Sequence, residues 1–545
     1  MEKFKNPFNF KMNSYNLIFL CCVSVLSVVE LIIKPYGNFP LNDDWVYALD
    51  SINSFLNKKY TITYFETAWG IPNVLLGIFL LNFFNFHHAL FRIIGVFSLV
   101  ASSYFLFLYL RKINNNKYFL IISLLTYIFY VPQLTVANTF MTDMPFAMFW
   151  IATCYFWDNA FEKIKTSFLW YGFIFFCLCV AQRQFGVLLL ISITSLFLLQ
   201  DKKSSNLTIF RIHAFGVCFL GLLVFLILNF WWQSINGQVP SSTIDTSIKG
   251  LFKGIYSRSF KTFHYLGLLL FPLSIFFILS SETLKNLYKE RLRTEFSFVK
   301  IFLFLIPFLF FAQTLYYMTL GNWMPYFNNQ LSVYGIFFHD VILCGSRPLL
   351  LDGWFPILLT IISTFTCLIF LIYYLWYKKI EFPLRFKYGY VLICSGVIYF
   401  LLMVTRYIIF DRYFLPFVPA LFVIIAYHRF RFTKWNITIS ILLIIINIIF
   451  STTILYDYFR SNEARWNLAN NLESRGVSRL DINAGYEWNG FKNNINKHFP
   501  DIKNDKYVVA FSPISGYRVD QIETYVSIWS PHIKKMYLLV NSVKE

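Results

Sequence analysis

The sequence predicts a mostly α-helical, polytopic membrane protein with about thirteen transmembrane helices, followed by a small α/β domain. Three observations lead to this fold class. The 545-residue chain is 57% hydrophobic and only 14% charged, a composition typical of polytopic membrane proteins and unusual for soluble ones. Long apolar segments recur through residues 1–457, and residues 458–545 are polar. We therefore predict a transmembrane domain over 1–457 and an extracytoplasmic domain over 458–545.

Thirteen apolar segments are predicted to cross the membrane, several of them short, as a helix beside a cavity can be. They lie at 15–33, 88–110, 118–132, 145–161, 167–181, 185–200, 209–231, 263–281, 299–320, 354–377, 388–404, 413–427 and 436–456. Segment 69–86 is also apolar but begins Trp-Gly-Ile-Pro, and we interpret it as an interfacial or re-entrant helix.

The basic residues indicate the orientation. Lys3, Lys5 and Lys11 precede the first span, which places the N-terminus in the cytoplasm by the positive-inside rule. Every second loop is rich in bases, and the loops between them hold fewer. The basic loop residues are Arg111, Lys112, Lys117, Lys163, Lys165, Lys202, Lys203, Arg211, Lys285, Lys289, Arg291, Arg293, Lys378, Lys379, Arg385, Lys387, Arg429, Arg431 and Lys434. An odd number of spans then places the C-terminus outside, and we expect an integral protein of a bacterial inner membrane.

The formal net charge of +19 would suggest a nucleic-acid partner in a soluble protein. Here the bases lie in short loops between apolar segments, so we interpret them as topology signals and contacts with lipid phosphates. We expect no nucleic-acid partner. The nine cysteines lack a C-x-x-C spacing and fall mostly in apolar segments, so we expect neither disulfides nor a zinc site.

The polar tail has its own pattern of elements. A helix-like run covers 463–475, and strand-like runs follow at 478–482, 506–511 and 535–540. This pattern predicts a small α/β domain resting on the outer surface of the membrane.

The first outer loop contains a pair of carboxylates, Asp43 and Asp44, and further along it Glu66. Charged groups at the edge of the lipid are costly to keep and are by default candidates for function. The alternative interpretation is a solvated loop that happens to contain acids.

Other outer turns add an acid and several bases. Asp143 precedes Met144-Pro145, a pattern that also suits the start of a helix. Arg183 lies between two apolar segments, where the alternative is an arginine reaching lipid headgroups. Arg406 and Arg412 lie in the penultimate outer turn, and for Arg412 the alternative is a surface pair with Asp411 of little energetic weight.

Acids and bases at one membrane interface suit chemistry on a lipid-linked phosphate. Arginine binds phosphate through two parallel hydrogen bonds, and a carboxylate can act as general base on an acceptor hydroxyl. Participation of a divalent cation is left open.

The order of the outer-face motifs resembles the GT-C glycosyltransferases, in particular the protein O-mannosyltransferases and the bacterial aminoarabinose transferases. The motifs are Asp-Asp-Trp-x-Tyr at 43–47, Met-Thr-Asp-Met-Pro at 141–145, Arg-Gln-x-Gly at 183–186 and Arg-Tyr-x-Leu-Pro-x-x-Pro at 412–419. The tail segment Asn-Ala-Gly-Tyr-Glu-Trp-Asn-Gly at 483–490 also resembles bacterial members.

This resemblance implies a sugar donor on polyprenyl phosphate and an acceptor hydroxyl on a lipid, glycan or protein. It implies that Asp43 is the catalytic acid of the pair. Asp44 stands where the family more often has Glu, and Ile71 stands where it commonly has a base before proline. The donor phosphate is therefore expected to be held by Arg183, with Arg406 or Arg412.

Three further residues lie in another outer loop: His339, Asp340 and Asp352. They are possible members of the site, although a solvated loop is the favoured interpretation of each.

The predicted function is sugar transfer on the outer face of the membrane, with inversion by a single displacement. One alternative is a transporter or flippase of lipid-linked sugars, and another is a ligase or polymerase of surface polysaccharide. Transporters place their important polar groups near the middle of the bilayer, and here the charges gather at the outer ends of the spans.

Overall fold

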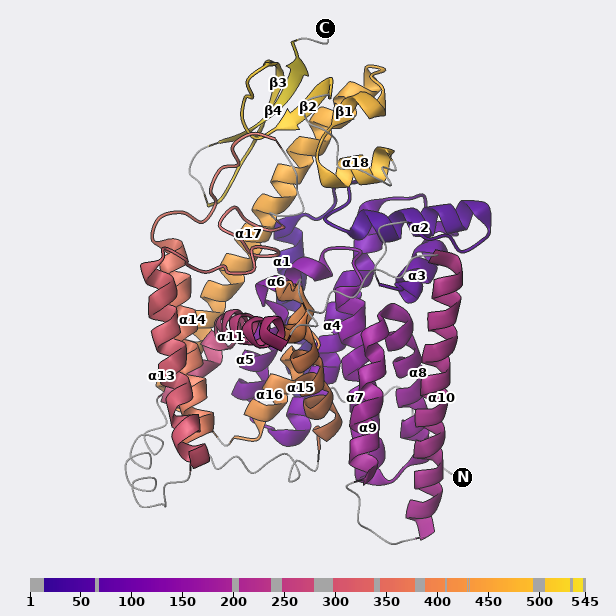
Figure 1. Cartoon of the computed structure of the whole chain (residues 1–545), viewed down its shortest axis with the longest axis vertical. Coiled ribbons are helices and arrows are strands. Elements are labelled where there is room, and N and C mark those ends of the chain that lie inside the picture. Colours follow the sequence, from indigo (N-terminus) through magenta and orange to yellow (C-terminus); the bar gives the residue numbers. More distant parts are fainter. Residues whose placement is uncertain are drawn as a thin grey trace, which may run out of the picture.

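The computed structural model describes residues 14–63, 68–198, 205–236, 248–278, 298–337, 344–377, 388–406, 409–428, 430, 432–493, 505–529 and 533–542. Helices of the bundle run along the long axis of the molecule, and a small sheet lies at one end (Figure 1).

Helices cover all thirteen segments predicted to cross the membrane. The helices of the bundle are α1 (Ser14–Ile33), α4 (His88–Ile113), α5 (Lys117–Ile128), α6 (Val131–Ala137), α7 (Asp143–Lys163), α8 (Thr166–Gln182), η1 (Gln184–Leu188), α9 (Leu189–Leu198), α10 (Ser205–Asn236), α11 (Ile248–Ile278), α13 (Phe298–Thr319), α14 (Phe355–Ile372), η2 (Tyr373–Tyr377), α15 (Tyr390–Thr405), η4 (Asp411–Phe414), α16 (Val418–Ala426) and α17 (Lys434–Ser474).

Among the described residues, six of these helices are long and apolar enough to cross a membrane, or seven if one bent pair is counted as a span. The bent pair is α5 and α6, which meet at 62°. Pro132 near the start of α6 explains the break, because proline has no N–H to donate to the carbonyl four residues earlier and its ring clashes with that carbonyl. An integral membrane protein is thus confirmed, and the number of thirteen spans stays a prediction.

Two short helices lie across the end of the bundle near the sheet (Figure 1). They are α2 (Asp44–Asn57) and α3 (Ile71–Leu81). The eleven residues of α3 are too few to cross a bilayer, as expected of an interfacial or re-entrant helix. No helix was predicted from the sequence at the position of α2.

Helix α17 joins the bundle to the sheet. Its 41 residues contain neither glycine nor proline, so no local signal interrupts the helix, and it ends shortly before Gly476 in a left-handed conformation. The helix predicted separately at 463–475 is therefore the last part of α17, and the proposed domain boundary at residue 457 falls inside this helix.

The tail forms a four-stranded sheet in the order β1–β2–β4–β3. Its elements after α17 are η5 (Arg479–Asp481), β1 (Ile482–Asn483), α18 (Tyr486–Asn493), β2 (Tyr507–Ala510), β3 (Tyr517–Tyr525) and β4 (Lys534–Asn541). Strand β1 pairs parallel with β2, and β4 pairs antiparallel with both β2 and β3. The predicted strand at 478–482 was wrong for most of its length, because residues 479–481 form the 3-10 helix η5. Strand β3 and helix α18 were missed.

Candidate active site

The predicted site residues come from five places at the sheet end of the bundle. Four are the start of α2, the start of α7, the junction of α8 with η1, and η4. The fifth place, the end of α15, contributes Arg406. Helices α7 and α8 are antiparallel neighbours, so the first residue of α7 and the last residues of α8 lie side by side. Arg412 in η4 contacts the carboxylates of both Asp43 and Asp143.

Asp43 immediately precedes α2 and reaches into the site from the loop that joins α1 to α2. Its carboxylate accepts hydrogen bonds from Nη2 of Arg412 at 2.9 Å and from the hydroxyl of Tyr486 at 3.0 Å. The Asp43 side chain is 34% exposed, whereas that of Arg412 is only 4% exposed. A carboxylate that is held in place and still open to solvent is suited to meet a substrate hydroxyl.

Arg183 and Asp143 form a buried ion pair with an Nη2–Oδ2 distance of 2.7 Å. Nε of Arg183 also donates to the Thr142 hydroxyl at 2.9 Å. Arg183 has an extended backbone just after α8, and Gly186 lets the chain return close to α8, because a Cβ there would lie 2.8 Å from the Val180 nitrogen. The Arg-Gln-x-Gly motif thus presents Arg183 to α7, where it pairs with Asp143.

Three guanidinium groups surround the ring of Tyr413. The centres of Arg183, Arg406 and Arg412 lie 5.9, 5.6 and 5.9 Å from its centroid, within the range of cation–π attraction. Nε of Arg412 is also 3.9 Å from the Asp143 carboxylate. All three predicted phosphate-binding arginines are therefore gathered within reach of one another.

Asp411 does not form the surface pair considered as an alternative. It is fully buried, and its carboxylate accepts hydrogen bonds from the backbone nitrogens of Gln330 and Leu331, both at 3.1 Å. Burial raises the pKa of Asp411 to about 6, against the hydrogen bonds that lower it. Asp411 fixes η4 to the loop between α13 and α14, and this leaves the Arg412 side chain to meet Asp43.

Asp44 points away from its neighbour and into the protein. Its side chain is fully buried and accepts hydrogen bonds from the backbone of Leu41 at 2.6 Å and of Phe140 at 3.5 Å. Burial raises the pKa of Asp44 to about 8, although nearby Arg92 lowers it. Arg92 also donates to the carbonyls of Pro35, Gly37 and Phe39 and so shapes the loop that leads to Asp43. We propose that Asp44 positions this loop.

The tail contributes residues to the site that the sequence analysis did not assign. Besides Tyr486, Glu487 accepts a hydrogen bond from the backbone of Asn42 at 3.2 Å and forms a buried ion pair with Arg465 at 2.7 Å. Gly490 lies against Trp45, since a Cβ there would be 2.5 Å from the indole. The segment 483–490 thus docks on the Asp43 loop, and its resemblance to bacterial members was the available signal.

Three of the possible site residues, Glu66, His339 and Asp340, lie outside the described residues. Asp352 is exposed before α14. Within the part of the chain that the structure describes, no group of three or more His, Cys, Asp or Glu residues is placed to hold a metal ion.

Comparison with known proteins finds one family model that matches part of the chain. Residues 74–232 match the model of the dolichyl-phosphate-mannose-protein mannosyltransferase family. The match includes Asp143 and Arg183, and it confirms the predicted resemblance to GT-C glycosyltransferases over this part of the chain. No curated protein matches the chain.

Two solved structures of ArnT from Cupriavidus metallidurans are similar to the chain. The apo structure shares 10% sequence identity at a TM-score of 0.41, and the match covers 98% of this chain and 99% of that one. The structure bound to undecaprenyl phosphate shares 10% identity at a TM-score of 0.39, and the match covers 95% and 97%.

Proposed function

We propose that this protein transfers a sugar from a polyprenyl-phosphate donor to a hydroxyl of a lipid, glycan or protein acceptor on the outer face of the membrane. The observation that carries the proposal is the contact of Asp43 with Arg412, beside Asp143 and Arg183. It brings a partly exposed carboxylate next to buried guanidinium groups, which are the two kinds of group that such a transfer requires.

Asp43 serves as the general base. Its carboxylate takes the proton of the acceptor hydroxyl, whose oxygen attacks the anomeric carbon while the bond from this carbon to the phosphate oxygen breaks. Attack opposite the leaving group inverts the anomeric configuration, as in inverting sugar hydrolysis. The Tyr486 hydroxyl and Arg412 orient the carboxylate from two sides.

The arginines stabilise the phosphate that leaves. Polyprenyl phosphate departs as an anion, and guanidinium groups fixed in advance stabilise charge that develops in the transition state. Arg183, Arg406 and Arg412 have this role, and Asp143 holds Arg183 and Arg412 in place through its two oxygens. Asp143 is accordingly a positioning residue.

An apolar groove supports a lipid-linked donor. It has a volume of about 260 Å³ and lies between α6, α11, α14 and α17, with Tyr130, Pro132, Leu331, Phe355, Phe450 and Trp529 among its lining residues. Leu331 also donates its backbone N–H to Asp411, the neighbour of Arg412. An apolar wall this close to the guanidinium groups suits a molecule with a hydrocarbon chain and a phosphate head.

The test is the Asp43→Asn variant, which keeps the shape of the side chain and removes its basicity. Sugar transfer from a polyprenyl-phosphate sugar should fall by about 10²–10⁴-fold, the usual contribution of a general base. Asp520→Asn is the matched control, because the Asp520 side chain is 32% exposed and lies far along the tail in β3. Activity of Asp43→Asn within tenfold of the wild type would refute the base and favour a transporter or a ligase.

A further inference from the structure

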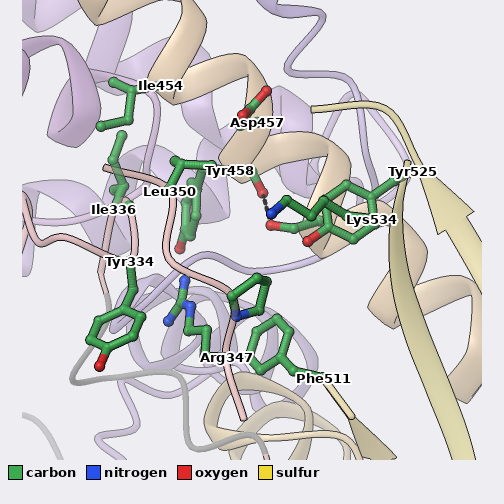
Figure 2. Close-up of a pocket in the computed structure, with 13 residues that line it drawn as sticks. Tyr334, Ile336, Arg347, Leu350, Ile454, Asp457, Tyr458, Phe511, Tyr525 and Lys534 are labelled. Carbon is green, nitrogen blue, oxygen red and sulfur yellow. Dashed lines mark hydrogen bonds between the residues drawn. The ribbon is translucent and has the colours of Figure 1, made fainter. Parts of the chain in front are cut away.

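A second pocket, with a partly polar lining, lies where three parts of the chain meet (Figure 2). One wall is the outer loop between α13 and α14, another is α17, and the third is the tail sheet. The pocket is lined by Tyr334, Gly335, Ile336, Arg347, Pro348, Leu350, Ile454, Asp457, Tyr458, Ser461, Phe511, Tyr525 and Lys534.

The polar side chains of the pocket are mostly hydrogen-bond donors. Arg347 points toward Tyr458, and Tyr525 and Lys534 enter from the sheet on the opposite side (Figure 2). Arg347 lies against the ring of Phe511, 5.1 Å from its centroid. Burial lowers the pKa of Arg347 to about 10, so its guanidinium remains protonated at neutral pH.

The loop that carries Arg347 is anchored to the sheet. The backbone of Phe511 donates to the Cys344 carbonyl at 3.0 Å, and the backbone of Ser346 donates to the Ser512 hydroxyl at 2.8 Å. A cation whose backbone is fixed from both sides loses little entropy when it binds a ligand.

Asp457, the acid that lines the pocket, is hydrogen-bonded to the tail. It accepts hydrogen bonds from the Ser527 hydroxyl and from the backbone nitrogens of Ile528 and Trp529, the last two at 2.8 and 3.5 Å. Its oxygens are thus satisfied largely by the tail, although Asp457 also lines the pocket within electrostatic reach of Lys534. The two cations among the lining residues, Arg347 and Lys534, outnumber this one acid. The pocket is therefore electrostatically suited to an anion.

The size of the pocket restricts the ligand. Its volume of about 30 Å³ is two to three times the roughly 10–15 Å³ that one water needs by this measure. One tetrahedral oxyanion fits this space better than a sugar ring. A phosphate offers three strong acceptor oxygens, and these match a guanidinium, an ammonium and tyrosine hydroxyls.

The pocket adjoins the proposed catalytic centre through one aromatic ring. Phe337 lies 5.9 Å from the Arg412 guanidinium and 5.7 Å from the ring of Tyr458, measured to ring centroids. Tyr458 lines the pocket, and Arg412 holds Asp43. A molecule whose anionic group occupies the pocket can therefore extend past Phe337 toward the catalytic base.

We infer that this pocket binds a phosphate group of the acceptor and so selects phosphorylated acceptors. The assignment of this phosphate to an acceptor rests on the proposed function, but the phosphate site itself does not depend on that function. The donor phosphate is assigned to the arginines around Tyr413, which leaves this second anion site for the other substrate.

The test measures binding of inorganic phosphate and of glucose 6-phosphate to the full-length protein in detergent by isothermal titration calorimetry. Three variants are compared with the wild type: R347Q/K534Q in the pocket, R183Q/R412Q at the catalytic cluster, and R475Q as a control for loss of an exposed cation just after α17. We expect R347Q/K534Q to weaken binding of both ligands at one site by at least tenfold. R183Q/R412Q and R475Q should retain that site.

The other possible outcomes would contradict either the inference or the proposed function. Unchanged binding in R347Q/K534Q overturns the pocket, and so does complete loss of phosphate binding in R183Q/R412Q. Binding of inorganic phosphate without glucose 6-phosphate shows a free-anion site and overturns the assignment to an acceptor. If R347Q/K534Q does not fold, K534Q alone is used, since Lys534 is only half-buried. If R183Q/R412Q does not fold, R406Q takes its place, since Arg406 belongs to the same cluster and is half-buried. A pocket that binds both ligands in a protein without transferase activity would refute the proposed function and keep the phosphate site.

Discussion

At the scale of single residues, the candidate site depends on ion pairs that are closed to solvent. The side chains of Arg412 and Asp143 are 4% and 2% exposed, and that of Arg183 is 12% exposed. Removing one partner of a buried pair leaves an uncompensated charge and typically costs about 3–5 kcal/mol. Conservative changes therefore report on chemistry better than alanine does, because they keep the charge.

Arg183→Lys tests whether this arginine contacts phosphate. Lysine keeps the charge but offers a point charge in place of the planar fork that holds Asp143 and Thr142. We expect turnover to fall, or the KM for the donor to rise, by at least several-fold, with unchanged expression. Steady-state kinetics with Arg475→Lys as the control measures this, and wild-type kinetics in Arg183→Lys would return the phosphate role to Arg406 and Arg412.

The raised pKa of Asp44 predicts that the stability of the folded protein depends on pH. Its pKa is about 8 in the folded protein and about 3.9 in an unfolded chain. Between these values the folded protein holds a proton that the unfolded chain releases, so the stability from this group falls as the pH rises from about 4 to 8. The slope is at most about 1.4 kcal/mol per pH unit.

Asp44→Asn removes this titration. The apparent melting temperature of Asp44→Asn, relative to that of the wild type, should therefore rise steadily between pH 5 and pH 8. Thermal unfolding in detergent at several pH values measures the difference. A difference that stays constant with pH would show that Asp44 is ionised in the folded protein.

At the scale of elements, the site depends on how α18 docks on α2. Tyr486 is the first residue of α18, and Gly490 one turn later lies against Trp45 of α2. Trp45 is almost fully buried, so it cannot move aside for a larger residue. The absence of a side chain at Gly490 therefore sets how closely Tyr486 approaches Asp43.

Gly490→Ala should separate these two helices. A methyl group would lie 2.5 Å from Trp45, and overpacking of this kind costs about 1–3 kcal/mol. We expect transferase activity to drop several-fold together with a lower melting temperature. Gly216→Ala in α10 is the control, since a methyl group added there would meet nothing within 4 Å. Equal activity of the two variants would show that the docking of α18 is not required.

At the scale of the whole molecule, the two ends of α7 lie in regions of different chemical character. Asp143 begins the helix within the candidate site, and Lys163 ends it in a basic loop. At 1.5 Å per residue, 21 residues extend about 32 Å, close to the roughly 30 Å of a hydrocarbon core. With α7 as one of the predicted spans, we expect the site and the basic loop at opposite surfaces of the membrane, and the tail contacts the site.

This arrangement predicts that the tail is extracytoplasmic. An alkaline phosphatase fused after Glu545 should be active, because the enzyme requires an oxidising compartment for its disulfides. A fusion after Lys165, in the loop that follows α7, is the control and should be inactive. Fluorescence from a green fluorescent protein fused after Glu545 would contradict this topology and would place the site at the opposite face of the membrane.

Much of the architecture followed from the sequence because it depends on local properties. Apolar length and the alternation of basic loops located the helices, and the order of short motifs indicated which turns carry the site. The elements that were missed, α2, β3 and α18, are short and contain many polar residues. Their structure is stabilised by contacts with the rest of the chain, so their local periodicity was weak.

By itself the sequence determined that this is a membrane protein and which acids and bases gather at one of its surfaces, because hydropathy and charge are properties of each segment. Only the tertiary structure decided their partners. Asp43 and Asp44 are adjacent, but successive residues at the start of a helix point about 100° apart. One therefore meets Arg412 and Tyr486, and the other enters the core. Tyr486 lies 443 residues from Asp43, and packing alone, without a local signal, brings two such residues together.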